Sequence, residues 1–110
     1  MTARLSIIGG QPVIGVVGEI DLATLPQLHN VLTRAVHEHL GGTIVVDLDG
    51  VHVCDDAGLG VLLGAAGRAR EAGGELVVVC TDGPLRNRLA RTGFDRAITV
   101  NESVASVVSS

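Results

Sequence analysis

Two short aliphatic runs, TIVVDL (43–48) and ELVVVC (75–80), constrain the fold of this chain more than any other feature. Uninterrupted runs of this length, rich in β-branched residues, are typical of strands buried on both faces, and such strands occur mainly in parallel sheets covered by helices. The segment between them, AGLGVLLGAAGRAREAG (57–73), keeps its apolar positions running until Arg68, which predicts a helix. The order strand, helix, strand indicates an α/β fold.

The rest of the chain continues this alternation. Leu25 to Leu40 carries apolar residues at three- and four-residue steps, which predicts an amphipathic helix that Gly41 and Gly42 end. The other expected elements are strands at 4–9, 12–18 and 96–100 and helices at 82–93 and 102–110. We therefore expect one domain over residues 1–110, with a mixed, partly parallel sheet and helices packed on it.

Composition excludes several classes of function. The net charge is −4 and the only basic cluster has acids interspersed, which argues against nucleic acid as a partner. The members of that cluster are Arg86, Arg88, Arg91 and Arg96, with Asp82 and Asp95. The start of the chain does not resemble a signal peptide, and no apolar run is long enough for a membrane helix, so we expect a cytoplasmic protein without membrane contact. Cys54 and Cys80 are expected to be buried, reduced thiols.

No residue pattern indicates an enzyme, and no cofactor is expected. Nucleophile and phosphate-loop motifs are absent, and GLG at 58–60 lacks the third glycine of a dinucleotide fingerprint. His52 and Cys54 would share a face if their strand continued, but too few further ligands accompany them for a zinc site. Glu19 and Asp21 could suggest acid–base chemistry, although Asp21 directly precedes a helical pattern and is better read as a helix cap.

The most informative polar residues are Asp55 and Asp56, at the junction between the strand ending at Cys54 and the helix beginning near Ala57. A helix N-terminus has unpaired N–H groups and a partial positive charge, so one acid there is ordinary capping. Two acids at the carboxyl end of a parallel strand lie where open α/β sheets place functional loops. The junction is therefore the first candidate for a functional site.

Five segments in order resemble the STAS domain of bacterial anti-sigma factor antagonists over residues 13–108: GEIDLAT, VVDLDGV, DDAGLGVLLGA, GGELVVV and LARTGFDRAITVNES. The resemblance implies a small α/β fold of about five strands and four helices that acts by binding a protein. The implied partner is an anti-sigma factor of the GHKL serine-kinase type, which then releases its sigma factor. Such a kinase can phosphorylate the antagonist on a serine of the motif Asp-Ser-Ser/Thr-Gly-Leu-Gly and so release it.

Laid on this chain, the motif places its Asp on Asp55, its phosphorylatable serine on Asp56 and the next hydroxyl residue on Ala57. No Ser or Thr lies between Thr43 and Thr81, so this loop has lost its phosphorylation site. A carboxylate carries less charge than a phosphoserine, so Asp56 is a partial mimic of the phosphorylated form. Two hypotheses follow: Asp56 holds the protein in a phosphorylated-like, non-binding state, or the partner is adapted to Asp56 and binding is constitutive. The second is slightly favoured.

The resemblance also implies supporting residues. Asp21 and Thr24 match the loop before the first helix, which tends to lie beside the switch loop, and Leu59 opens the second helix. Gly58 and Gly60 either allow close approach of the partner or pack the helix against the sheet. We expect a monomer or weak dimer. The alternative function is a sensory or scaffold STAS module that binds a nucleotide or another small ligand in a stress-signalling assembly.

Overall fold

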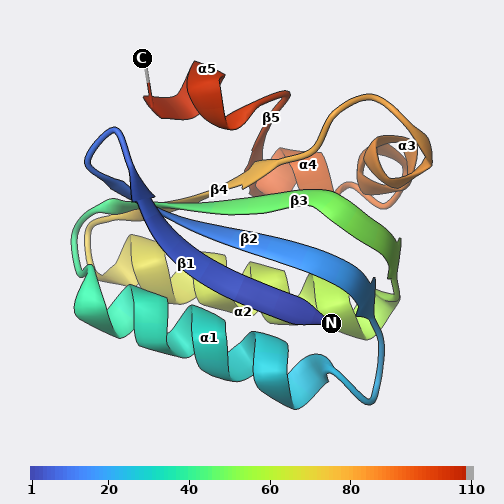
Figure 1. The fold of residues 1–110 in the computed structure, drawn as a ribbon, viewed down its shortest axis with the longest axis horizontal. Helices are drawn as coiled ribbons and strands as arrows, with labels where there is room; N and C mark the ends of the chain where they lie inside the picture. Colours follow the sequence, from blue (N-terminus) through green and yellow to red (C-terminus); the bar gives the residue numbers. More distant parts are fainter. Residues whose placement is uncertain (109–110) are drawn as a thin grey trace.

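A five-stranded mixed sheet forms the centre of the protein, which we describe from a computed structural model over residues 1–108 (Figure 1). The strands are β1 (Thr2–Ile8), β2 (Gln11–Ile20), β3 (Thr43–Cys54), β4 (Glu75–Val79) and β5 (Thr99–Asn101). They lie side by side in chain order. β1 is antiparallel to β2, whereas β2, β3, β4 and β5 are mutually parallel. The predicted mixed sheet is confirmed.

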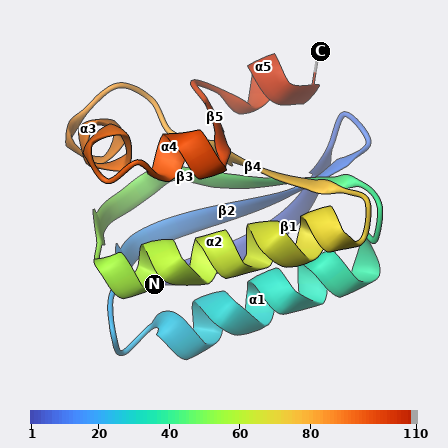
Figure 2. The ribbon, with the colours of Figure 1, turned by 180° about the vertical axis from the view of Figure 1, so that it is seen from behind.

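Five helices accompany the sheet in the described part of the chain: α1 (Leu25–Glu38), α2 (Asp56–Glu71), α3 (Pro84–Arg91), α4 (Phe94–Ala97) and α5 (Val104–Val108). α1 and α2 lie next to one another along the same face of the sheet (Figure 2). α5 lies on the opposite side of the sheet from α1 and α2 (Figure 1). None of the helices within residues 1–108 is both long enough and apolar enough to cross a membrane.

The core has two parts because successive strand residues point to opposite faces of the sheet. Ile44 and Val46 of β3 belong to the main core, into which α1, α2, α3 and α4 pack. Val45 between them belongs to a smaller cluster on the other face, which includes Val107 of α5. Burial on both faces explains why β3 and β4 appear in the sequence as continuous aliphatic runs.

β3 is longer than the sequence indicated. The aliphatic run suggested a strand over 43–48, but pairing with β2 continues until Ile20 lies opposite Cys54. The polar stretch from Asp47 to Gly50 hid this extension, and the β2–β3 register shifts near it, between Gly15 and Val17 and again before Glu19. The junction at Asp55 therefore lies at the end of a long strand whose last residue is still paired with β2.

The C-terminal third differs most from the sequence prediction. A strand was predicted over 96–100, but Phe94–Ala97 form α4, and β5 begins only at Thr99. Gly93, with a φ of 78° in the left-handed region, separates α3 from this single turn.

Other boundaries moved by a few residues: β1 and β2 extend to Thr2 and Ile20, and α1, α2 and β4 end at Glu38, Glu71 and Val79. Helix α3 begins at Pro84 rather than at residue 82, and α5 begins at Val104 rather than at 102. Ser109 and Ser110, the end of the predicted terminal helix, lie outside the described residues.

Candidate partner-binding site

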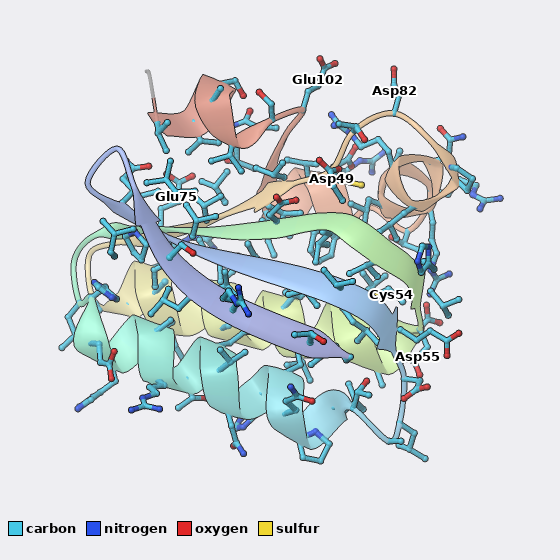
Figure 3. All side chains as sticks on the ribbon, viewed as in Figure 1. Asp49, Cys54, Asp55, Glu75, Asp82 and Glu102 are labelled. Carbon is cyan, nitrogen blue, oxygen red and sulfur yellow. The ribbon has the colours of Figure 1, made fainter. Side chains whose placement is uncertain are left out.

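Two loops meet at the carboxyl edge of the parallel strands. Ile20, the last residue of β2, is the register partner of Cys54, the last residue of β3. The Asp55 N–H donates a hydrogen bond to the Ile20 carbonyl at 3.2 Å, which ties the start of one loop to the start of the other. Figure 3 shows Cys54 and Asp55 at this end of the sheet. The predicted proximity of the 21–24 turn to the Asp55–Asp56 junction is thus present in the fold.

Asp55 is the N-cap of α2. Its Oδ1 accepts a hydrogen bond from the Gly58 N–H at 2.9 Å, and its carbonyl accepts one from Leu59. These bonds satisfy donors that the first turn of a helix otherwise leaves unpaired. The cap expected from the sequence is therefore formed by Asp55, whose carboxylate faces its own helix.

Asp56 is the first residue of α2, and its side chain is 87% exposed. Its Oδ1 lies 2.5 Å from a terminal guanidinium nitrogen of Arg88, a residue of α3. The Arg88 Nε donates a second hydrogen bond, of 2.9 Å, to the Cys54 carbonyl. From the sequence, Arg88 is only a member of a mixed-charge cluster, because nothing in the chain indicates which face of α3 lies against the end of β3.

The 21–24 turn is held by reciprocal bonds between Asp21 and Thr24. The Asp21 carboxylate accepts from the N–H groups of Ala23 and Thr24 at 3.1 and 3.2 Å, and the Thr24 hydroxyl accepts from the Asp21 N–H at 2.9 Å. The prediction that Asp21 caps α1 is wrong in detail: Thr24 occupies the N-cap position without a side-chain cap, while Asp21 closes the turn before it.

A shallow groove of about 460 Å³ adjoins Asp56 between the start of α2 and the α3–α4 connection. Leu59, Gly60 and Leu63 line it from α2. Thr92, Gly93, Phe94 and Ala97 line it from the other side. The exposed carboxylate at the sheet edge therefore continues into a largely apolar surface.

Comparison with known proteins decides the family. A family model described as the STAS domain matches residues 3–107. The chain belongs to the STAS domain family. Within its fold, this STAS domain resembles an anti-sigma factor antagonist from Mycobacterium paratuberculosis, with a TM-score of 0.87 at 24% identity over 98% of this chain and 91% of the other. It also resembles SpoIIAA in its unphosphorylated form, with a TM-score of 0.71 at 17% identity, covering 96% of this chain and 93% of that one. The phosphorylated form of SpoIIAA, a Bacillus cell fate determinant, gives 0.70 at 17% identity over 96% of both chains.

The two glycines of the STAS motif have different surroundings. Gly58 is buried, and a Cβ there would lie 2.5 Å from Ile20 Cγ2 and 3.0 Å from Cys54 Sγ. Gly60 is exposed, and a Cβ there would meet nothing within 4 Å. Of the two interpretations left open by the sequence, helix–sheet packing therefore applies to Gly58, while Gly60 is open to solvent.

The candidate site residues thus divide into a supporting and an accessible set. Asp55, Gly58 and Leu59 are turned into the domain or bound to its backbone, although Leu59 still lines the groove. Asp56, Ala57 and Gly60 are exposed on the first turns of α2. Asp21 and Thr24 are half-buried in the adjacent turn.

The two residues considered as metal ligands in this STAS domain, His52 and Cys54, do not share a face of β3. β3 does continue to Cys54, but Cys54 is buried while His52 is exposed. Burial, with a smaller contribution from the neighbouring Asp55 charge, raises the pKa of the Cys54 thiol to about 11. Such a thiol stays protonated at neutral pH and is a poor nucleophile and metal ligand. Within residues 1–108, no group of three or more His, Cys, Asp or Glu side chains is arranged to hold a metal ion.

Proposed function

We propose that this STAS domain is an anti-sigma factor antagonist that binds an anti-sigma factor of the GHKL serine-kinase type and so frees a sigma factor. The observation that supports this best is the accessible set at the sheet edge. Asp56, Ala57 and Gly60 are exposed together at the position of the family's switch loop, beside the 21–24 turn and the apolar groove. The domain acts as one unit and as a monomer or weak dimer.

Binding is constitutive in this proposal. The motif position that carries the phosphorylatable serine holds Asp56, and a carboxylate cannot accept a phosphoryl group in the way a serine hydroxyl does. The fold brings two other hydroxyls near this loop, that of Thr24 in the adjacent turn and that of Thr92 in the groove. Both hydroxyls donate to backbone carbonyls: Thr24 to Glu19 and Thr92 to Arg88. These bonds support a structural role for the two hydroxyls.

Calorimetry tests the proposal directly. The protein is titrated into each GHKL anti-sigma kinase of its own genome, first with ADP and then with ATP, as wild type and as Asp56→Ser. We expect wild type to bind one kinase tightly in both nucleotides, whereas Asp56→Ser binds with ADP and is released with ATP. Mass spectrometry after the ATP incubation should find phosphate on the introduced serine of the Asp56→Ser variant and none on Thr24 or Thr92 of wild type.

Two results would contradict parts of the proposal. If only Asp56→Ser binds, Asp56 mimics the phosphorylated state and constitutive binding is wrong. If neither protein binds any of the kinases, the partner class itself is wrong.

A candidate site for the alternative function, a ligand-sensing STAS module, fits a nucleotide poorly. A cavity of about 260 Å³ opens between the second half of β3 and the loop that follows β4, where the carbonyl of Cys80 accepts a 2.7 Å hydrogen bond from Arg86. This volume is below the roughly 300 Å³ at which ligand sites usually begin, and the lining includes Asp49 and Asp82, which disfavour a phosphate. Thermal unfolding with GTP or ATP present separates the alternatives, because only a nucleotide-binding module should gain stability.

A further inference from the structure

We infer that Arg88 is an internal counter-ion for Asp56, so that the partner meets an Asp56 whose charge is already neutralised. The inference rests on the proposed function for the identity of the partner, while the ion pair itself belongs to the free protein. It assigns to Arg88 a positioning role at the binding surface. It also gives the partner a chemistry: the segment that covers Asp56 needs no basic residue of its own.

Arg88 is held from two directions. Its Nε donates to the Cys54 carbonyl at 2.9 Å while a terminal nitrogen lies 2.5 Å from Asp56 Oδ1, so one guanidinium joins the end of β3 to the start of α2. The Arg88 side chain is 32% exposed, against 87% for Asp56. Exposed ion pairs usually contribute little because both side chains must be immobilised. Here the carbonyl bond already fixes the planar fork of the arginine, so less freedom is lost in forming the pair.

Other charges near the pair do not compete for either partner. The Asp55 carboxylate accepts the Gly58 N–H of its own helix. Arg86, two residues before Arg88 on α3, donates instead to the Cys80 carbonyl. Arg91 lines the same notch as Arg88, between α3 and the end of β3, and no polar partner for its guanidinium is seen within the described residues. The pairing is therefore between Arg88 and Asp56 alone.

The charge balance distinguishes this loop from a phosphorylated one. A phosphoserine carries roughly −1.5 to −2 charges, whereas Asp56 carries one that a single guanidinium matches. The start of α2 adds a partial positive charge rather than a negative one. A partner that rejects a phosphorylated loop by its net negative charge would therefore accept this one. The pair thus supplies a physical reason for constitutive binding.

A double-mutant cycle measures the pairing in the complex. Calorimetry against the cognate anti-sigma factor compares wild type, Arg88→Met, Asp56→Asn and the double variant, with Arg91→Met as the control on the same helix. We expect Arg88→Met to weaken binding by about tenfold, because it leaves a bare carboxylate at the interface. The double variant should recover most of that loss, and Arg91→Met should bind as wild type does. An equal loss in Arg88→Met and in the double variant, or no loss in Arg88→Met, would overturn the inference.

A measurement on the free protein separates this inference from the proposed function. Nitrogen-15 measurements on the Arg88 guanidinium should show slow rotation of the terminal nitrogens that pair with Asp56 in wild type and faster rotation in Asp56→Asn, whereas Nε, which donates to the Cys54 carbonyl, stays ordered in both. Asp21→Asn is the control for loss of a nearby carboxylate. A mobile Arg88 guanidinium in wild type would disprove the counter-ion role and would leave the proposed partner class unaffected. If Arg88 is ordered but the protein binds no anti-sigma kinase, the counter-ion role stands and the proposed partner class is wrong.

Discussion

Asp55 and Asp56 are adjacent in sequence and have opposite tasks. The Asp55 carboxylate is directed at the backbone of α2 and accepts the Gly58 N–H, so it stabilises the helix start. The Asp56 carboxylate instead pairs with Arg88 of the neighbouring helix α3. A single step along the chain, from the N-cap to the first residue of α2, separates a residue that stabilises the fold from one at the surface. Substitution at the two positions should therefore affect different properties.

Removing the cap at position 55 should cost stability. Asp55→Ala leaves the Gly58 N–H unpaired and should lower the free energy of unfolding by about 0.5–2 kcal/mol. Asp55→Asn, the matched control, keeps the acceptor oxygen and should lose only a few tenths of a kcal/mol. Urea unfolding followed by circular dichroism measures both. If the two variants lost the same amount, the charge of Asp55 rather than its hydrogen bond would be the stabilising feature.

The Cys54 thiol should be unreactive at neutral pH, and its ionisation should destabilise the fold at alkaline pH. Burial raises its pKa from the ordinary 9.0 to about 11 in the folded state, so the stability that the protonated thiol contributes is complete below about pH 9 and is lost as the pH rises through 11. The sequence contains no Tyr, and its basic side chains other than His are all arginine, so few other groups titrate in that range. Unfolding free energies from pH 8 to 11 should fall for wild type and fall less for Cys54→Ala. A thiol reagent at pH 8 should react quickly only after urea is added.

At the scale of the elements, helix α2 packs closely against the end of the sheet at Gly58 but not at Gly60. Gly58 faces Ile20 and Cys54, so its missing side chain sets how closely the helix approaches β2 and β3. Gly60, two residues later, faces solvent beside the groove. The helix is thereby positioned by a close contact on its inner side. The position of α2 in turn determines where Asp56 and Ala57 are presented.

Alanine substitutions at the two glycines should have opposite signs. Gly58→Ala should destabilise the protein by about 1–3 kcal/mol, because the new methyl group would overlap Ile20 or force α2 outward. Gly60→Ala adds a methyl group in open space and should stabilise the helix by about 0.5–1 kcal/mol. Thermal and urea unfolding of the pair measures both effects. If both substitutions stabilised the protein, the contact of Gly58 with Ile20 and Cys54 would be able to accommodate a methyl group without loss of stability.

The elements that could be predicted are those whose own residues show a clear pattern, either an aliphatic run or a helical period. β3, β4 and α2 were recognisable because burial on both faces leaves aliphatic runs and because α2 keeps its apolar positions up to Arg68. α4 was missed because a four-residue helix is too short to show a period. The Arg88–Asp56 pair was missed for a different reason. Its partners lie 32 residues apart, and their contact depends on the packing of α3, which no local pattern encodes.

At the scale of the whole molecule, α5 completes the second face of the sheet. Val107 packs with Val13, Val45, Val77 and Val79, which point away from α1 and α2. Without this short helix, a row of aliphatic side chains would lie open on that face. Nearer β1 the same face stays more accessible, and Val17 there is 55% exposed. A five-residue element thus shields part of a sheet that the two long helices cannot reach.

Truncating the Val107 side chain should therefore lower the stability of the whole domain. Val107→Ala removes two buried methyl groups and should lower the free energy of unfolding by about 1–2 kcal/mol. Leu22→Ala, at a position 79% exposed, is the control and should change stability by less than about 0.5 kcal/mol. Urea unfolding of the two variants provides the comparison. An unchanged midpoint for Val107→Ala would show that α5 contributes nothing to the core.

The chain order of the strands has a consequence for how the protein is made. Because β1 to β5 lie in the sheet in the order in which they occur in the sequence, no strand has to insert between two earlier ones. During synthesis, at roughly 5–20 residues per second, each new strand therefore follows the strand beside which it lies in the finished sheet. The order of synthesis and the order of the strands across the sheet agree.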